Sequence, residues 1–178
     1  MLHYQFETIH PFLDGNGRIG RLLVSLQLIQ DGVLPSPVLN LSTYIEKFKS
    51  EYYERLQAVR ERGQLDEWVN FFARAIATQA KEGVVMVRQL LALQEKYRNQ
   101  IVGDRSGSRE LVDVLFANPV VTVKRVQHEL KISQPSASSL LKKAENAGWI
   151  SLLERSGRGG KQTWYAHEIW KATTKENW

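Results

Sequence analysis

Residues 10–21, HPFLDGNGRIGR, gather one imidazole, one carboxylate, three glycines and two guanidinium groups within twelve positions. Apolar residues on both sides of this stretch recur at helical spacing, so the glycines are expected in a loop that leads into a helix beginning near Arg18 or Ile19. Backbone N–H groups at a helix N-terminus, together with the helix dipole, attract anions. The stretch therefore predicts a phosphate-binding loop.

The charged side chains of this stretch indicate which phosphate it would hold. Arg18 and Arg21 add two cations with planar donor forks, which suits a diphosphate or triphosphate better than a monophosphate. Asp14 could hold Mg²⁺, which takes one or two carboxylates plus phosphate oxygens, although a turn cap is the alternative for this residue. His10 can accept a proton near neutral pH and activate a hydroxyl, although a structural role at a helix end is its alternative.

Helical periodicity continues through the first 102 residues. The expected helices are residues 1–9, a buried helix from Ile19 to Ile29, a helix from Tyr44 to Arg62, a helix capped by Asp66 that carries Trp68 to Ile76, and a further helix from Gly83 to Ile101. This pattern predicts an all-helical bundle over residues 1–102, in a chain whose fold class is mainly α.

A second domain is expected over residues 109–178, after a linker at residues 103–108. Its pattern is three short helices, with Thr122 capping the second and Ser133 the third, followed by strands at 149–153 and 162–165. Three helices and a hairpin predict a small winged helix-turn-helix domain. Its expected core includes Trp149, Trp164 and Tyr165.

Most of the net positive charge of the chain lies in this second part. Residues 108–178 carry 11 basic and 7 acidic side chains, against 13 and 12 in residues 1–107, which points to nucleic acid as a possible partner. The candidate DNA-binding residues are Ser136, Ser138, Ser139, Lys142 and Lys143 of the third helix and Arg155, Arg158 and Lys161 of the wing. A protein-docking module is the alternative for this domain.

The amino-acid composition excludes several other classes of protein. The 178 residues are 43% hydrophobic and 24% charged, with net charge +5 and no cysteine, so disulfides and thiolate zinc sites are excluded. The longest apolar run is shorter than a membrane span, and the first residues do not read as a secretion signal. A cytoplasmic location is therefore expected.

The stretch at residues 10–21 resembles the signature of the Fic family, His-Pro-Phe-x-Asp/Glu-Gly-Asn-Gly-Arg-x-x-Arg. The resemblance extends through residues 37–42, 51–56 and 68–72, which are similar to the downstream core of that family. Bacterial members commonly carry an appended winged helix as well. The expected architecture is therefore a Fic-type helical bundle followed by a winged helix-turn-helix domain.

This resemblance implies a protein adenylyltransferase, which transfers AMP from ATP with Mg²⁺ to a serine, threonine or tyrosine hydroxyl of a target protein. The implied roles are His10 as general base, Asp14 as Mg²⁺ ligand, Gly15, Asn16 and Gly17 as the anion hole for the α- and β-phosphates, and Arg18 and Arg21 as ligands of the β- and γ-phosphates.

The chain also departs from the family pattern. Fic cores carry further helices and a β-hairpin flap before the motif, whereas nine residues precede His10 here, so a shortened chain without the flap is expected. Leu2, Phe6 and Ile9 would then be exposed, and self-association into a homo-oligomer could cover them. The alternative to an enzyme is a DNA-binding regulator or interaction module whose Fic part has no catalytic activity.

Overall fold

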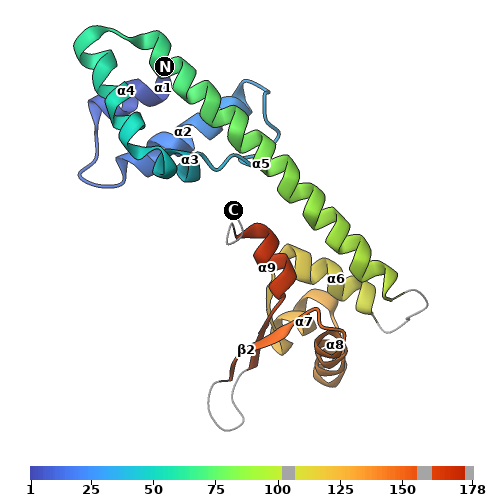
Figure 1. Ribbon diagram of the computed structural model, residues 1–178. Coiled ribbons are helices and arrows are strands. Elements are labelled where there is room, and N and C mark those ends of the chain that lie inside the picture. Colours follow the sequence, from blue (N-terminus) through green and yellow to red (C-terminus); the bar gives the residue numbers. More distant parts are fainter. Residues whose placement is uncertain (102–106, 156–161, 175–178) are drawn as a thin grey trace. The chain divides into compact units, whose positions relative to one another are not determined.

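The protein is mainly α, as the sequence predicts. The computed structural model describes residues 1–101, 107–155 and 162–174, and in these ranges the only sheet has three short strands (Figure 1). None of the helices in these ranges is long and apolar enough to cross a membrane. The chain forms two compact units, Met1–Val85 and Met86–Trp178, and the boundary between them lies inside one long helix.

The first unit is built from helices alone. They are α1 (Leu2–Ile9), α2 (Asn16–Gln30), α3 (Leu41–Lys47), α4 (Lys49–Arg62) and the first part of α5 (Leu65–Asn99). Its core is aromatic: the Trp68 ring of α5 lies 5.6 Å from that of Tyr52 on α4, and Phe71 lies 5.7 Å from Tyr44 on α3. These four side chains are buried and hold α3, α4 and α5 together.

Helices α1 and α2 pack closely where α2 carries Gly20. A Cβ atom at Gly20 would lie 2.7 Å from Glu7 Oε1 and 2.9 Å from Nδ1 of the buried His3, both on α1. A side chain at this position would therefore push the two helices apart or displace both polar groups.

Helix α2 differs from its predicted form. It begins at Asn16 rather than near Arg18 or Ile19, because Gly15 adopts a left-handed conformation (φ 84°) that lets the helix start directly after it.

The side chains of α2 are also less buried than its apolar periodicity predicts. The buried residues are Asn16, Gly20 and Ser25, whereas Leu22 and Leu26 are 53% and 49% exposed. The prediction of a buried helix was wrong, since the polar and small face of α2 is the one that meets the rest of the unit. Leu2 and Ile9 of α1 are exposed as expected, whereas Phe6 is partly buried.

Three further helix boundaries differ from the predicted ones. The helix expected from Tyr44 to Arg62 is interrupted at Phe48, whose φ and ψ of −114° and 38° are not helical. Helix α5 begins at Leu65, so Asp66 lies in its first turn rather than at its cap. The same helix runs without a break through Gly83, because one glycine lowers helix stability by only ~1 kcal/mol.

The second unit combines the end of α5 with four short helices and the sheet. Its elements are α6 (Ser108–Ala117), β1 (Val120–Thr122), α7 (Val123–Leu130), α8 (Gln134–Asn146), β2 (Ser151–Arg155), β3 (Gln162–Tyr165) and α9 (His167–Thr173). The strand order is β1-β3-β2, with both pairings antiparallel and a register shift between Leu152 and Glu154. Of the expected linker, residues 103–106 lie outside the described ranges and Ser108 already begins α6.

Most of the predicted elements of the second unit are present. Thr122 accepts a hydrogen bond from the Arg125 N–H and caps α7, and Ser133 accepts one from the Ser136 N–H and caps α8. Strand β1 and helix α9 were not predicted, because three and seven residues are too short to give a clear periodicity.

The core of the second unit includes two of the three aromatic residues predicted there. Trp149 and Trp164 are 3% and 7% exposed, whereas Tyr165 is partly exposed. The Trp149 ring stacks on Tyr97 of α5 with centroids 5.0 Å apart, and its Nε1–H donates to Gln100 Oε1 at 2.5 Å. The end of α5 is therefore an integral part of this unit.

Replacing Leu115 of α6 tests this core. The side chain is fully buried, so we expect Leu115→Ala to lower the free energy of unfolding by about 2–5 kcal/mol through lost burial and a residual cavity. The matched control is Leu153→Ala on β2, where the side chain is 57% exposed and the loss should stay below about 0.5 kcal/mol. Urea unfolding followed by circular dichroism measures both; equal losses would show that Leu115 is not in a packed core.

Candidate phosphate-binding site and helix α8 surface

The turn between α1 and α2 carries the predicted site. Helix α1 ends at His10, which has left-handed φ and ψ of 49° and 57° and donates its backbone N–H to Phe6 O at 2.9 Å. A non-glycine residue adopts this conformation only at some cost, so the chain turns sharply at the candidate base. The His10 side chain is 60% exposed and thus accessible to a substrate.

Backbone N–H groups converge at the start of α2. The first N–H groups of an α-helix have no acceptor within the helix, and α2 begins directly after the left-handed Gly15. The Gly15 N–H itself donates to Asp14 Oδ1 at 2.7 Å. Among the described side chains none caps α2, so the N–H groups that follow Gly15 are not occupied by a side-chain cap, as an anion-binding nest requires.

Asn16 holds this turn in place. Its side chain is buried, its Oδ1 accepts the Phe12 N–H at 3.0 Å, and its Nδ2 donates to Phe12 O at 2.5 Å. Both ends of the amide are thereby used by the loop. The structure thus gives the Asn16 side chain a positioning task, and only its backbone N–H is left for an anion.

The two arginines of the motif are held differently. Arg18 is 76% exposed, and its Nη2 lies 3.5 Å from Asp14 Oδ2, a surface contact that contributes little stability. Arg21 donates its Nε–H to Ser42 Oγ on α3 at 2.8 Å. Its Nη1 would be 3.1 Å from a Cβ atom at Gly17, so the guanidinium lies directly beside the glycine turn.

Sequence reasoning missed three side chains at this site. Ser42 orients Arg21, while Glu7 places Oε2 3.9 Å from His10 Nδ1 and Oε1 3.9 Å from His3 Nε2. The sequence signal was the spacing of residues 3, 7 and 10, which puts these side chains on one face of a helix. Burial lowers the pKa of His3 to about 4 and raises the pKa of the Glu7 carboxyl above its usual value.

The residues at the turn fit a phosphate ligand with Mg²⁺. In the described ranges, no group of three or more histidine or acidic side chains is arranged so that it could hold a metal ion, so a metal site made by protein ligands alone is not found there. Mg²⁺ is commonly bound by one carboxylate together with phosphate oxygens, and the Asp14 carboxylate is 94% exposed beside the nest. The donor set therefore suits Mg²⁺ only together with a phosphate.

The candidate DNA-binding residues gather on one face of α8. Ser136, Ser138, Ser139, Lys142 and Lys143 are all exposed, while Ala137, Leu140, Leu141 and Ala144 of the same helix are buried. The Arg155 side chain and the whole of Arg158 and Lys161 lie outside the described part of the structure.

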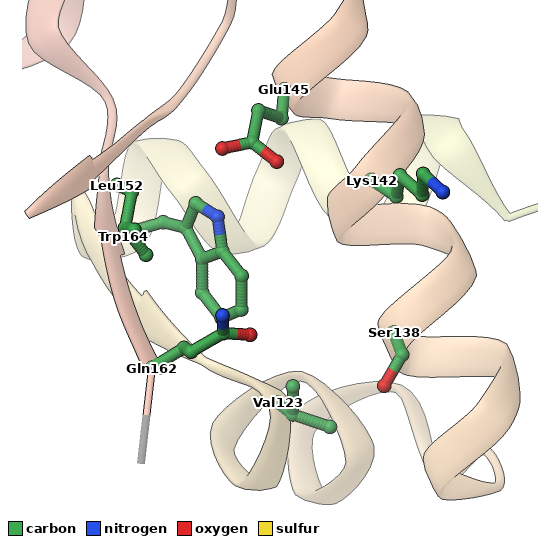
Figure 2. Close-up of a pocket in the computed structure, with 7 residues that line it drawn as sticks. All are labelled: Val123, Ser138, Lys142, Glu145, Leu152, Gln162 and Trp164. Atoms are coloured by element: carbon green, nitrogen blue, oxygen red, sulfur yellow. The ribbon is translucent and has the colours of Figure 1, made fainter. Parts of the chain in front are cut away.

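A cavity of about 390 Å³ lies between α8 and the hairpin. Ser138, Lys142 and Glu145 of α8 line one side, and Leu152, Gln162 and Trp164 of the strands line the other, as Figure 2 shows. The Trp164 Nε1–H is buried and has no hydrogen-bond partner among the described residues. Two candidate DNA-binding residues, Ser138 and Lys142, therefore border a hollow between the helix and the sheet.

Comparison with known proteins finds similar sequences for the N-terminal segment of the chain. The sequence model of the Fic/DOC family matches residues 1–28, which contain the whole turn and its flanking helices up to Leu28. The chain is 43% identical over 49 residues to a probable protein adenylyltransferase of Aquifex aeolicus, covering 28% of this chain and 15% of that protein. This N-terminal segment is therefore similar to the Fic/DOC family.

Animal relatives give a similar match. The chain is 37% identical over 73 residues to the protein adenylyltransferase Fic of Aedes aegypti and 38% identical over 72 residues to the protein adenylyltransferase fic-1 of Caenorhabditis elegans. These matches cover 41% and 40% of this chain. The chain spans only 13–15% of the length of these relatives.

Exchange of Gly15 for alanine separates backbone strain from ligand binding. Alanine is strained at the φ of 84°, so Gly15→Ala should cost about 1 kcal/mol of stability and weaken binding of a nucleoside triphosphate about tenfold or more, as the nest is distorted. Gly32→Ala, at a φ of 69° with no atom near its Cβ position, should cost similar stability without loss of binding. Calorimetric titration measures both; equal affinity of the two variants would contradict a nest at Gly15.

Proposed function

We propose that this chain carries the nucleotide site of a protein adenylyltransferase, which transfers AMP from ATP to a serine, threonine or tyrosine hydroxyl of a target protein. The observation that carries the proposal is the turn at residues 12–16, clamped by Asn16, with Arg21 fixed beside it by Ser42. Such a turn stabilises a polyphosphate in one orientation. The names of the family relatives support the type of reaction.

In the proposed reaction the target hydroxyl oxygen forms a bond with the α-phosphorus of ATP. The bond from that phosphorus to the oxygen bridging to the β-phosphate breaks, pyrophosphate leaves, and the hydroxyl proton passes to the His10 imidazole. His10 suits this role because its side chain is exposed at the sharp end of α1. Catalysis is then mostly positioning and charge neutralisation.

Each remaining residue of the turn has a task around the phosphates. Gly15, Asn16 and Gly17 would form the anion hole for the α- and β-phosphates, with the backbone N–H groups of Asn16 and Gly17 as donors, because the Gly15 N–H already donates to Asp14 Oδ1. Arg18 and Arg21 would bind the β- and γ-phosphates. Asp14 would hold Mg²⁺, which neutralises charge on the phosphate oxygens when bound.

The first test is AMP transfer by the purified chain with ATP and Mg²⁺, alone and in cell lysate, followed by intact mass. We expect His10→Ala to reduce transfer at least about 100-fold, because general base catalysis contributes 10²–10⁴-fold. The matched control is His128→Ala on α7, an exposed histidine of the second unit. Equal transfer by the His10→Ala and wild-type proteins would contradict the assignment of the base.

We also propose that the second unit is a winged helix-turn-helix that binds DNA through α8. The observation that favours this candidate is the exposed face of serines and lysines on α8, which follows the capped turn at Ser133. Serines are poor helix formers, so their grouping on one exposed face suggests that the hydroxyls make contacts. If the first unit lacked catalytic activity, DNA binding by α8 would make the chain a DNA-binding regulator. If α8 bound a protein instead of DNA, the second unit would be a docking module.

Salt dependence tests the DNA proposal. Binding to duplex DNA should weaken steeply with rising salt, and Lys142→Ala should reduce the slope of log K against log salt by about 0.9, since one phosphate contact is lost. Lys171→Ala on α9 removes the same charge elsewhere and should leave the slope unchanged. Fluorescence anisotropy measures the binding constants at each salt concentration. Identical slopes in both variants would show that α8 is not the DNA-binding face.

A further inference from the structure

Glu7 occupies a position that is unfavourable for a carboxylate. Its side chain is 8% exposed, burial raises the pKa of its carboxyl group, and Oε1 has no hydrogen-bond partner among the described residues. It also lies in the last turn of α1, where the helix dipole disfavours a negative charge. The fold alone gives little reason for a glutamate here, since an apolar residue would avoid all three costs.

Two imidazoles flank this carboxylate, and only one of them can balance its charge. His3 Nε2 and His10 Nδ1 each lie 3.9 Å from a Glu7 oxygen. Burial lowers the pKa of His3 to about 4, and His3 Nε2 also shares a hydrogen bond of 3.1 Å with the Tyr52 hydroxyl, so His3 is neutral near pH 7. His10, which is 60% exposed, is the histidine whose positive charge can stabilise Glu7.

Packing against α2 fixes the carboxylate in this place. Oε1 lies where a Cβ atom at Gly20 would be only 2.7 Å away, so α2 forms a wall behind the Glu7 side chain. The positive charge of Arg21, the residue after Gly20, also acts on this carboxylate. Glu7 is therefore held between the candidate base and the glycine-rich helix.

We propose that Glu7 is a positioning residue for His10. Its carboxylate accepts the Nδ1–H of the imidazole, which leaves the Nε2 lone pair to receive a proton and stabilises the imidazolium that results. The two atoms are 3.9 Å apart in this structure, and a rotation of the exposed imidazole would bring them to hydrogen-bond distance, since such contacts often tighten only when a substrate binds. This inference deepens the proposed function and rests on it for its catalytic meaning.

The contact itself is tested by nuclear magnetic resonance of the full chain labelled with ¹⁵N-histidine, in alkaline buffer and without nucleotide. The ¹⁵N chemical shifts report which ring nitrogen carries the proton. We expect the Nδ1–H form of His10 in the wild type, a shift towards the Nε2–H form in Glu7→Gln, and a partial return in Glu7→Asp. Glu54→Gln, an exposed change of the same kind on α4, should leave the His10 signals unchanged.

Activity and stability separate positioning from a merely structural role. We expect Glu7→Gln to lower kcat for AMP transfer by about 10–100-fold with little change in the KM for ATP, as is usual for groups that orient a reacting residue. Its Tm should be equal or higher, because the cost of burying a carboxylate is removed. A lower Tm with unchanged kcat would make Glu7 a structural residue and overturn the proposal.

The chemical-shift measurement and the AMP-transfer assay together distinguish failure of the positioning role from failure of the proposed function. If His10 has the same tautomer in the wild type and in Glu7→Gln, the positioning role is wrong, whether or not AMP is transferred. If the tautomer depends on Glu7 but the chain transfers no AMP to any protein, the proposed reaction fails while the contact between Glu7 and His10 stands.

Discussion

The direction of a few backbone N–H groups decides whether a glycine-rich turn can hold phosphate, and here one buried amide fixes it. Asn16 bridges both the N–H and the carbonyl of Phe12, so a single side chain closes the loop. Because the amide is 2% exposed and satisfied at both ends, water does not compete for its hydrogen bonds. This closure lies directly beside the left-handed turn at Gly15 and the start of α2.

Charges at the turn are mostly left available for a ligand. Asp14 and Arg18 are 94% and 76% exposed and 3.5 Å apart, so neither is strongly engaged by the other. By contrast, the polar groups behind the turn, Glu7 and His3, are buried against Gly20. The turn thus has an exposed side with two opposite charges and a buried side formed by Glu7 and His3.

The sequence predicted the helices and the motif well, because both are local. The caps at Thr122 and Ser133 are set by side chains within three residues. What it missed depends on distant packing: α2 buries its small polar face rather than its leucines, since the close approach of α1 at Gly20 decides which face turns inwards. Ser42 was missed for the same reason, as its bond to Arg21 joins residues of different helices.

The bond between Arg21 and Ser42 has an entropic consequence. An arginine side chain carries about 2 kcal/mol of rotamer freedom, and Arg21 has already lost part of it on folding because its Nε–H is tied to Ser42 Oγ. Arg18, with only a loose contact to Asp14, must lose that freedom when a ligand arrives. In the proposed site, two arginines of equal charge would therefore contribute unequally to affinity, and the pre-ordered Arg21 would give the larger net gain.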